Sequence, residues 1–160
     1  MIEIESATVT RSYPAISASV PAARRAVVAL AAEAGASRGR LEAIALALSE
    51  ALTNAVVHAY RGEEGQVHLT AGVVSGELWV LVADDGCGLC ARTDSPGLGH
   101  GLRLIALSAD GLEIVRRSTG GTEVRMQFTL HAAGDVHRAH ARGSVSSART
   151  PASSRFSTTR

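Results

Sequence analysis

The 160-residue sequence predicts an α+β sandwich, in which a mixed, mainly antiparallel sheet carries helices on one face. Segments rich in Ala and Leu repeat apolar residues at three- and four-residue steps, which is the period of an α-helix. Other segments, rich in Val, Ile and Thr, come in pairs joined by short glycine-containing turns, as β-hairpins do. At this length the chain is expected to form about one domain.

The first part of the chain predicts a strand and a helix. Residues 3–11 alternate in polarity, which indicates a strand that ends at Tyr13 and Pro14. Pro21 suits the first turn of a helix. The apolar positions that follow continue this helix to Gly35, because glycine commonly ends helices.

The second helix, expected to begin at Ser37 or Arg38, contains the most informative stretch of the sequence. Strong helix formers fill it without Gly or Pro, and apolar residues at helical spacing predict a core face. Glu50, Asn54 and His58 stand four residues apart and therefore share one side of the helix. An acid, an amide and an imidazole beside a buried face indicate chemistry, although for His58 we expect packing or hydrogen bonding rather than catalysis.

A β-hairpin is expected after the second helix. Residues 66–74 form its first strand, Ser75 and Gly76 form the turn, and residues 77–84 form the returning strand. Because the apolar run in the returning strand is nearly continuous, we expect it to be buried on both faces.

A third helix and a second hairpin complete the predicted domain. The helix is expected to begin between Gly99 and Leu102, after a glycine-rich stretch, and to end near Ser108. Residues 111–118 and 121–130 form the hairpin.

The charged residues exclude some kinds of chemistry. All 16 basic residues are Arg, so Schiff-base catalysis and the lysine-containing phosphate loop are excluded. Residues 131–160 carry five Arg and one Asp, a charge of +4 that leaves −3 for the rest of a chain whose net charge is +1. Beyond residue 131 no pattern could bury apolar surface, so we expect a domain of residues 1–131 and a disordered Arg/Ser-rich tail of residues 132–160.

The sequence predicts a cytoplasmic protein. No stretch is apolar for long enough to predict a membrane span, and the amino end lacks the features of a secretory signal. Cys87 and Cys90 are the only cysteines, too few for a disulfide scaffold. With no second pair, we do not expect this Cys-x-x-Cys to hold zinc or to do redox chemistry.

Glu50 and Asn54 form the first pattern that could carry chemistry. The amide oxygen of Asn54 is a hard, neutral ligand of the kind that suits Mg²⁺ shared with phosphate oxygens. Glu50, one turn earlier, could accept a proton from a hydroxyl or a water. Taken alone, both residues are more typical of the solvated face of an amphipathic helix.

Asp84 begins a second pattern, Asp-x-Gly-x-Gly, at the end of a predicted strand. A partly desolvated carboxylate there can accept a hydrogen bond from an amine such as the exocyclic amine of adenine. Gly86 and Gly88 would let the backbone come close to a ligand. Asp85 holds the variable position and is expected to face away. The alternative is a tight turn that merely contains glycine.

Two further glycine patterns follow. Gly97, Gly99 and Gly101 lead into the third helix, whose free N–H groups favour an anion such as phosphate. This pattern does not follow a strand directly, which argues against a dinucleotide-binding turn. Thr122 follows two glycines at the start of the last strand, where a simple hairpin turn is the other explanation.

The order and spacing of these four patterns resemble the Bergerat-type ATP-binding fold of the GHKL superfamily, which includes DNA gyrase, the Hsp90 chaperones, histidine kinases and mismatch-repair ATPases. The resemblance covers roughly residues 5–130. Within the superfamily the sequence is similar to the anti-sigma factor serine kinases of bacterial sporulation and stress control. Three features support that similarity: the sequence of residues 50–60, the opening strand followed by residues 20–25, and the short loop between Gly88 and Gly97.

The resemblance implies a role for each residue of the patterns. Asn54 would hold Mg²⁺ on the phosphates of ATP, and Glu50 would be the base that takes the proton of the substrate serine. Asp84 would hold adenine, and Arg92 and Arg103 are candidates for γ-phosphate contacts. The remaining nucleotide-binding residues would be Gly86, Gly88, Gly97, Gly99, His100, Gly101, Leu102 and Thr122.

The resemblance therefore implies an ATP-dependent protein serine kinase that sequesters a sigma factor and phosphorylates an anti-anti-sigma protein of the STAS type. By the same resemblance we expect the protein to form a homodimer and to make no direct contact with nucleic acid or a membrane. One alternative is a non-catalytic, ATP-gated protein-binding module, and another is the catalytic domain of a histidine kinase. The latter normally needs a phosphoacceptor hairpin, which the roughly 35 residues before the second helix do not supply.

Overall fold

The computed structural model describes residues 8–87 and 98–131 of the chain. In chain order its elements are β1 (Thr8–Pro14), α1 (Ser19–Glu33), α2 (Arg38–His58), β2 (Gln66–Val74), β3 (Glu77–Asp84), α3 (Leu98–Ser108), β4 (Gly111–Arg116) and β5 (Thr122–Thr129). The strands form one sheet in the order β1-β2-β3-β5-β4, and all neighbouring strands run antiparallel. The predicted α+β class is confirmed, but the described sheet is antiparallel throughout rather than mixed.

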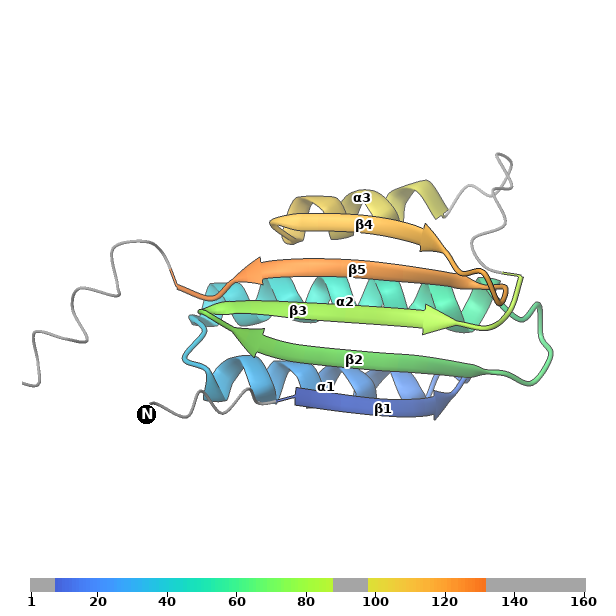
Figure 1. The fold of residues 1–160 in the computed structure, drawn as a ribbon, viewed down its shortest axis with the longest axis horizontal. Helices are drawn as coiled ribbons and strands as arrows, with labels where there is room; N and C mark the ends of the chain where they lie inside the picture. The colour runs from blue at the N-terminus through green and yellow to red at the C-terminus, as the bar shows by residue number, and fades with distance from the viewer. Residues whose placement is uncertain (1–7, 88–97, 132–160) are drawn as a thin grey trace, which may run out of the picture.

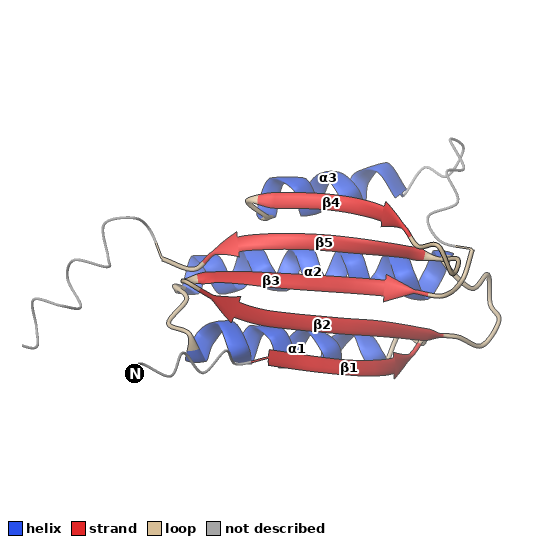
Figure 2. Ribbon diagram, viewed as in Figure 1, coloured by secondary structure: helices blue, strands red, loops and turns tan. Residues whose placement is uncertain are grey.

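The helices and the sheet form two layers. All three helices lie on the same face of the sheet, with α2 behind its central strands (Figures 1 and 2). In β3 the side chains of Leu78, Val80 and Val82 point toward the helices and are buried. Trp79 points the other way and is 44% exposed. The prediction that this strand is buried on both faces is therefore wrong, because no described element covers the outer face.

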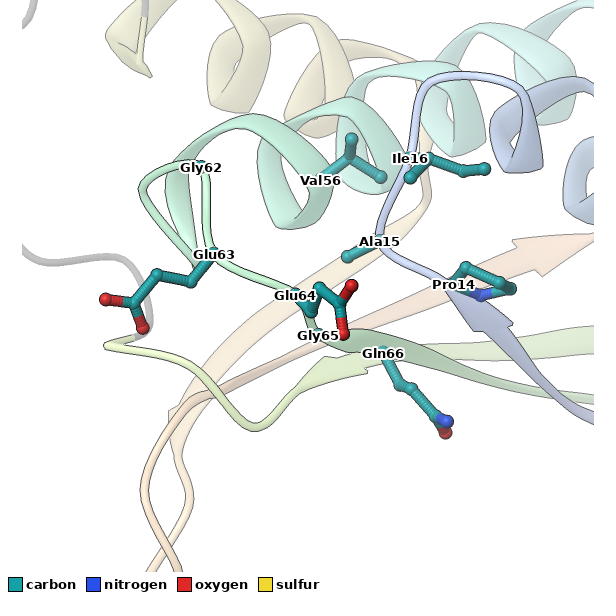
Figure 3. Close-up of a pocket in the computed structure, with 9 residues that line it drawn as sticks. All are labelled: Pro14, Ala15, Ile16, Val56, Gly62, Glu63, Glu64, Gly65 and Gln66. Atoms are coloured by element: carbon teal, nitrogen blue, oxygen red, sulfur yellow. The ribbon is translucent and has the colours of Figure 1, made fainter.

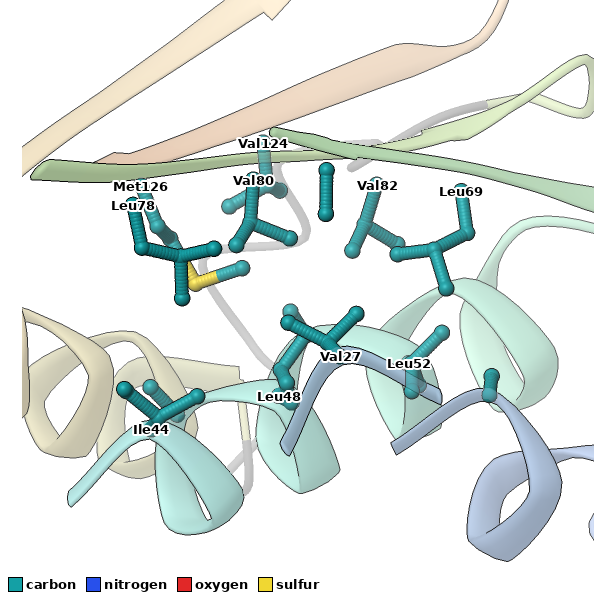
Figure 4. Close-up of a cluster of buried hydrophobic side chains, with 14 of the residues drawn as sticks. Val27, Ile44, Leu48, Leu52, Leu69, Leu78, Val80, Val82, Val124 and Met126 are labelled. Carbon is teal, nitrogen blue, oxygen red and sulfur yellow. The ribbon is translucent and has the colours of Figure 1, made fainter. Parts of the chain in front are cut away.

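Aliphatic side chains fill the space between the two layers (Figure 4). Ile44, Leu48 and Leu52 project from α2 toward the sheet and are at most 2% exposed. They face side chains of the inner sheet surface such as Leu78 and Val80. Because burying one such side chain contributes about 1.5–3 kcal/mol, this seam orients α2 and the polar residues along its flank.

α2 is also the one described helix that is long and apolar enough to cross a membrane by length and composition. The prediction that no stretch meets this criterion is therefore wrong for this 21-residue helix. Its six buried residues belong to the core between helices and sheet, which accounts for its apolar composition. They are Ile44, Ala47, Leu48, Ala51, Leu52 and Ala55.

Most predicted boundaries agree with the structure to within a few residues, and β1 differs most. This strand continues past Arg11 and ends at Pro14, so Tyr13 and Pro14 are its last paired residues. Pro14 pairs with Gln66 on the edge strand of the sheet, where a missing N–H donor is tolerated. The first residues of the predicted strand, 3–7, lie outside the described part of the chain.

The carboxyl end of the described chain packs back onto earlier elements. His131 donates a hydrogen bond from Nε2 to the carbonyl oxygen of Ala34 at 3.1 Å. The N–H of Leu130 donates to the carbonyl oxygen of Gly76 at 2.9 Å. The predicted tail, residues 132–160, lies outside the described residues.

The other end of the sandwich brings together segments that are far apart in the sequence. The ends of α2 and β3, the start of α3 and the β4–β5 turn all lie there (Figure 1). These segments contain the described residues of the four sequence patterns.

Candidate functional site

Asp84 is the buried charged group of this end of the molecule. The alternation of β3 turns its side chain toward the helices, where the residue is 5% exposed. Its carboxylate accepts hydrogen bonds from the backbone N–H of Gly86, at 3.1 Å, and from that of Thr122. Burial raises the pKa of Asp84 above its usual value, although the two hydrogen bonds oppose this shift. A carboxylate with this little hydration is poised to accept a further hydrogen bond from a ligand.

Glu50 and Asn54 lie side by side on the flank of α2, as their spacing predicts. The first turn of α3 packs against them through Gly101. A Cβ atom at position 101 would lie 2.8 Å from Oε2 of Glu50 and 3.3 Å from Nδ2 of Asn54. Only glycine therefore leaves both side chains undisturbed. The amide nitrogen of Asn54 is buried and has no hydrogen-bond partner among the described residues, so it is available to a ligand.

A small cavity joins the two groups of residues. Asn54 from α2, Asp84 from β3 and Thr122 from β5 line it together with apolar side chains. Its volume is about 10 Å³, which is close to the space that one water molecule needs. The apolar lining residues are Ala51, Ala55, Ala59, Val82 and Val124. Three of the predicted site residues thus share one cavity, with Glu50 beside it.

Two glycines are required here by close backbone contacts. A Cβ atom at Gly86 would lie 2.1 Å from the carbonyl oxygen of Ala59, so this glycine lets the end of β3 pack against the end of α2. Gly121 has a φ of +83°, and its Cβ would lie 1.9 Å from the carbonyl oxygen of Asp84. Gly121 was not among the predicted site residues, although its place before Thr122 was a usable signal.

Other predicted site residues lie farther from the cavity. Gly99 and His100 are exposed in the first turn of α3, and Arg103 is exposed in its second. Leu102 is partly buried and packs against the core. Gly88, Arg92 and Gly97 lie outside the described residues.

Asp85, the variable residue of the second pattern, belongs to a cluster of polar side chains whose other members lie in none of the patterns. Asp85 faces away from the helices and is half exposed. It contacts His68 of β2 and Arg117 of the β4–β5 turn. The hydrogen bond from His68, followed by that from Arg117, lowers the pKa of Asp85 below its usual range. Strand pairing brings these residues together, so periodicity along the chain contains no sign of them.

A larger pocket of about 620 Å³ opens beside the connection between α2 and β2 (Figure 3). It is lined by Pro14, Ala15, Ile16, Val56, Gly62, Glu63, Glu64, Gly65 and Gln66. Two carboxylates and no cation are among these residues, so the pocket is a poor place for a phosphate-bearing ligand. The smaller cavity has room for only about one water molecule, but it is lined by the polar groups that a nucleotide could engage, the buried carboxylate of Asp84 and the amide nitrogen of Asn54.

Known proteins resemble this chain in sequence. A family model described as "Histidine kinase-like ATPase domain" matches residues 13–128. An anti-sigma F factor of Shouchella clausii is 34% identical over 131 residues, which cover 74% of this chain and 90% of that protein. An anti-sigma F factor of Clostridium botulinum is 28% identical over 117 residues, which cover 66% of this chain and 82% of that protein.

Two more similarities concern a kinase and a solved structure. The serine-protein kinase RsbW of Bacillus licheniformis is 35% identical over 105 residues, which cover 62% of this chain and 64% of that protein. The crystal structure of the RsbU and RsbW domains of a Mycobacterium tuberculosis protein matches with a TM-score of 0.61 at 22% identity. That match covers 78% of this chain and 32% of the other, and it shows likeness of fold alone.

The two neighbouring aspartates should affect stability in opposite directions as pH changes. Because the pKa of Asp84 is raised on folding, its ionisation destabilises the folded state as pH rises through the folded-state pKa. Asp84→Asn is therefore expected to be more stable than the wild type at pH 7, and this advantage should disappear below about pH 4, near the unfolded carboxyl pKa.

Asp85→Asn is the matched control for Asp84→Asn. The pKa of Asp85 is lowered on folding, so its contribution to stability is present at pH 7 and is lost as pH falls through the folded-state pKa. This variant should be less stable than the wild type at pH 7 and approach it in acid. Urea unfolding of all three proteins between pH 3 and 8 measures the slopes, and parallel curves would contradict the assignment.

Gly121 and Gly120 form a second matched pair. Both have positive φ, so an alanine at either position should lose about 1 kcal/mol of stability from backbone strain. Only at Gly121 does the new Cβ meet backbone, since the nearest atom at Gly120 is 4.0 Å away. Gly121→Ala is therefore expected to lose about 2 kcal/mol more than Gly120→Ala in urea unfolding. Equal losses would show that the close approach to Asp84 is readily relieved.

Proposed function

Because the chain belongs to the histidine kinase-like ATPase family and to its anti-sigma factor branch, we propose that it is an ATP-binding anti-sigma regulatory factor with protein serine kinase activity. The observation that carries this proposal is the cavity shared by Asn54, Asp84 and Thr122, with Glu50 at its side. Curated relatives named anti-sigma F factor and serine-protein kinase support it.

The donor and acceptor groups of the cavity suit ATP. Asp84 offers a buried acceptor to the exocyclic amine of adenine, and leaving that pair unmade costs about 1–3 kcal/mol, which confers selectivity for the base. Asn54 offers its amide nitrogen, which has no hydrogen-bond partner among the described residues, as a donor to a phosphate oxygen. The other residues proposed to contact the nucleotide are Gly86, Gly88, Gly97, Gly99, His100, Gly101, Leu102 and Thr122.

The proposed chemistry is phosphoryl transfer from ATP, which when bound supplies the γ-phosphoryl group. Glu50 accepts the proton of the substrate serine hydroxyl, because its carboxylate lies beside Asn54 and against the start of α3. The amide oxygen of Asn54 binds Mg²⁺, a cation that prefers oxygen ligands and retains phosphate oxygens and water. Positioning and charge stabilisation account for most of the rate in reactions of this kind.

The proposed partners are a sigma factor, which the protein sequesters, and a STAS-type anti-anti-sigma protein, which carries the acceptor serine. Homodimer formation is proposed as well. Partners of this kind imply a cytoplasmic location. The ATP-binding domain is proposed to span residues 1–131, with residues 132–160 as a separate tail.

Glu50→Gln tests the catalytic role. The variant keeps the size and shape of the side chain but cannot take a proton, so phosphorylation of the cognate anti-anti-sigma protein should fall by about 100-fold or more. ATP binding should change little. Glu42→Gln, at an exposed position of the same helix, is the control.

Radiolabel transfer from ATP and calorimetric ATP binding give the two measurements for Glu50→Gln. If the wild-type protein binds ATP but transfers nothing to its cognate antagonist, the protein is an ATP-gated binding module instead of a kinase. If it binds no ATP at millimolar concentration, the proposal fails.

Asn54→Ala tests the metal site. Losing the amide should weaken binding of Mg-ATP by about tenfold or more, equivalent to about 1.4 kcal/mol, with a much smaller effect on metal-free ATP. Calorimetric titrations with Mg²⁺ and with EDTA provide the comparison. Equal weakening in both conditions would mean that Asn54 contacts the nucleotide without binding the metal.

A further inference from the structure

Polar side chains surround Asp85 at the exposed face of the sheet, directly beside the buried carboxylate of Asp84. We propose that Asp85, held by His68, Arg117 and Tyr60, positions the neighbouring Asp84 for recognition of the adenine base. These residues, together with Ser12, are named the Asp85 clamp. The inference rests on the proposed function, since it concerns how the ATP site selects its base.

The clamp holds the carboxylate of Asp85 from β2 and from the β4–β5 turn. Nε2 of His68 lies 2.5 Å from Oδ2 of Asp85, and Nη1 of Arg117 donates to Oδ1 of the same carboxylate. The other ring nitrogen of His68 lies 2.8 Å from the hydroxyl oxygen of Ser12, its direct partner in the β1–β2 register. The ring is therefore held at both nitrogens, and it cannot turn without breaking a hydrogen bond.

The clamp also holds the peptide bond that joins Asp84 to Asp85. The carbonyl oxygen of Asp84 accepts from Nη1 of Arg117 at 3.0 Å, and the N–H of Asp85 donates to the hydroxyl of Tyr60 at 2.9 Å. That hydroxyl in turn donates to the carbonyl oxygen of Gln66. The pairing of β3 with β5 stops at Ala83 and its pairing with β2 stops at Asp84, so side chains hold this peptide at the end of the strand ladder.

Fixing this peptide fixes the direction of the Asp84 side chain. The peptide plane sets the ψ angle of Asp84, and the carboxylate must meet the exocyclic amine of a base within a narrow range of distance and angle. A hydrogen bond weakens steeply when its angle falls toward 120°. A small rotation of this peptide would therefore weaken recognition of adenine more than it would weaken general binding of a nucleotide.

The energetics favour a positioning role over a stabilising one. Asp85 and its partners are partly exposed, with side-chain exposures of 50% for Asp85, 35% for His68 and 29% for Arg117. Exposed ion pairs typically add only about 0–1 kcal/mol to stability. A residue with three polar contacts and only a modest effect on stability, directly beside a buried binding carboxylate, acts mainly by setting geometry.

Selectivity between ATP and inosine triphosphate tests the inference, because inosine has a carbonyl oxygen in place of the exocyclic amine of adenine. The full-length wild-type protein should bind ATP more tightly than inosine triphosphate. Asp85→Ala and His68→Ala should each reduce this preference by about fivefold or more, chiefly through weaker ATP binding. His68→Gln retains an N–H donor that can reach Asp85 and should keep most of the preference.

The controls separate geometry from stability. Glu113→Ala removes a comparable ion pair with Arg125 on the same face of the sheet, 3.1 Å long and remote from Asp84, and should leave the preference unchanged. Thermal unfolding of each variant shows that the protein titrated is folded. A merely structural clamp would lower the folded fraction and leave the selectivity of the folded protein as it was.

Two outcomes would overturn the inference in distinguishable ways. If the wild type discriminates between the two nucleotides and both alanine variants discriminate equally well, the clamp does not position Asp84, and the proposed function stands. If the wild type binds neither nucleotide, the proposed function fails and the inference fails with it.

Discussion

The structure depends on one constraint, the burial of a carboxylate at the end of a strand. Asp84 lies on the inner face of β3 because strand alternation places it beyond Leu78, Val80 and Val82. A buried carboxylate needs hydrogen-bond partners, and the backbone N–H groups of Gly86 and Thr122 supply them. These two hydrogen bonds do not fully offset the effect of burial, so the pKa of Asp84 stays raised. A ligand that donates a further hydrogen bond to this carboxylate would therefore stabilise its ionised form.

The same alternation separates two adjacent acids into different roles. Asp84 points into the helix-covered face, and Asp85 emerges at the open face, where polar side chains of neighbouring strands reach it. Asp84 therefore presents its carboxylate to the candidate nucleotide site. Asp85 contacts polar side chains of the sheet, and these contacts are the ones proposed to position Asp84. The two-layer architecture makes this division available, because only one face of the sheet is covered by described helices.

α2 links the core to the site. Its buried stripe packs against the sheet, and Glu50 and Asn54 follow on the adjoining flank, so the packing that orients the helix also sets the position of these two side chains. Gly101 then lets α3 approach both of them closely. The acid and the amide come from α2 and the buried carboxylate comes from β3, and the hydrophobic seam between helix and sheet keeps them in register.

The sequence alone determined the elements and the order of the candidate site residues. Helical and strand periods, glycine turns and the spacing of Glu50, Asn54, Asp84 and Thr122 are local features, and they predict local structure directly. Only the tertiary structure decided that β1 includes Pro14, that Trp79 faces outward, and that Gly121 approaches Asp84. It also decided that Ser12, His68, Asp85 and Arg117 meet. These outcomes depend on which strands pair, in which register and under which covering layer, and such long-range pairings leave no periodic trace along the chain.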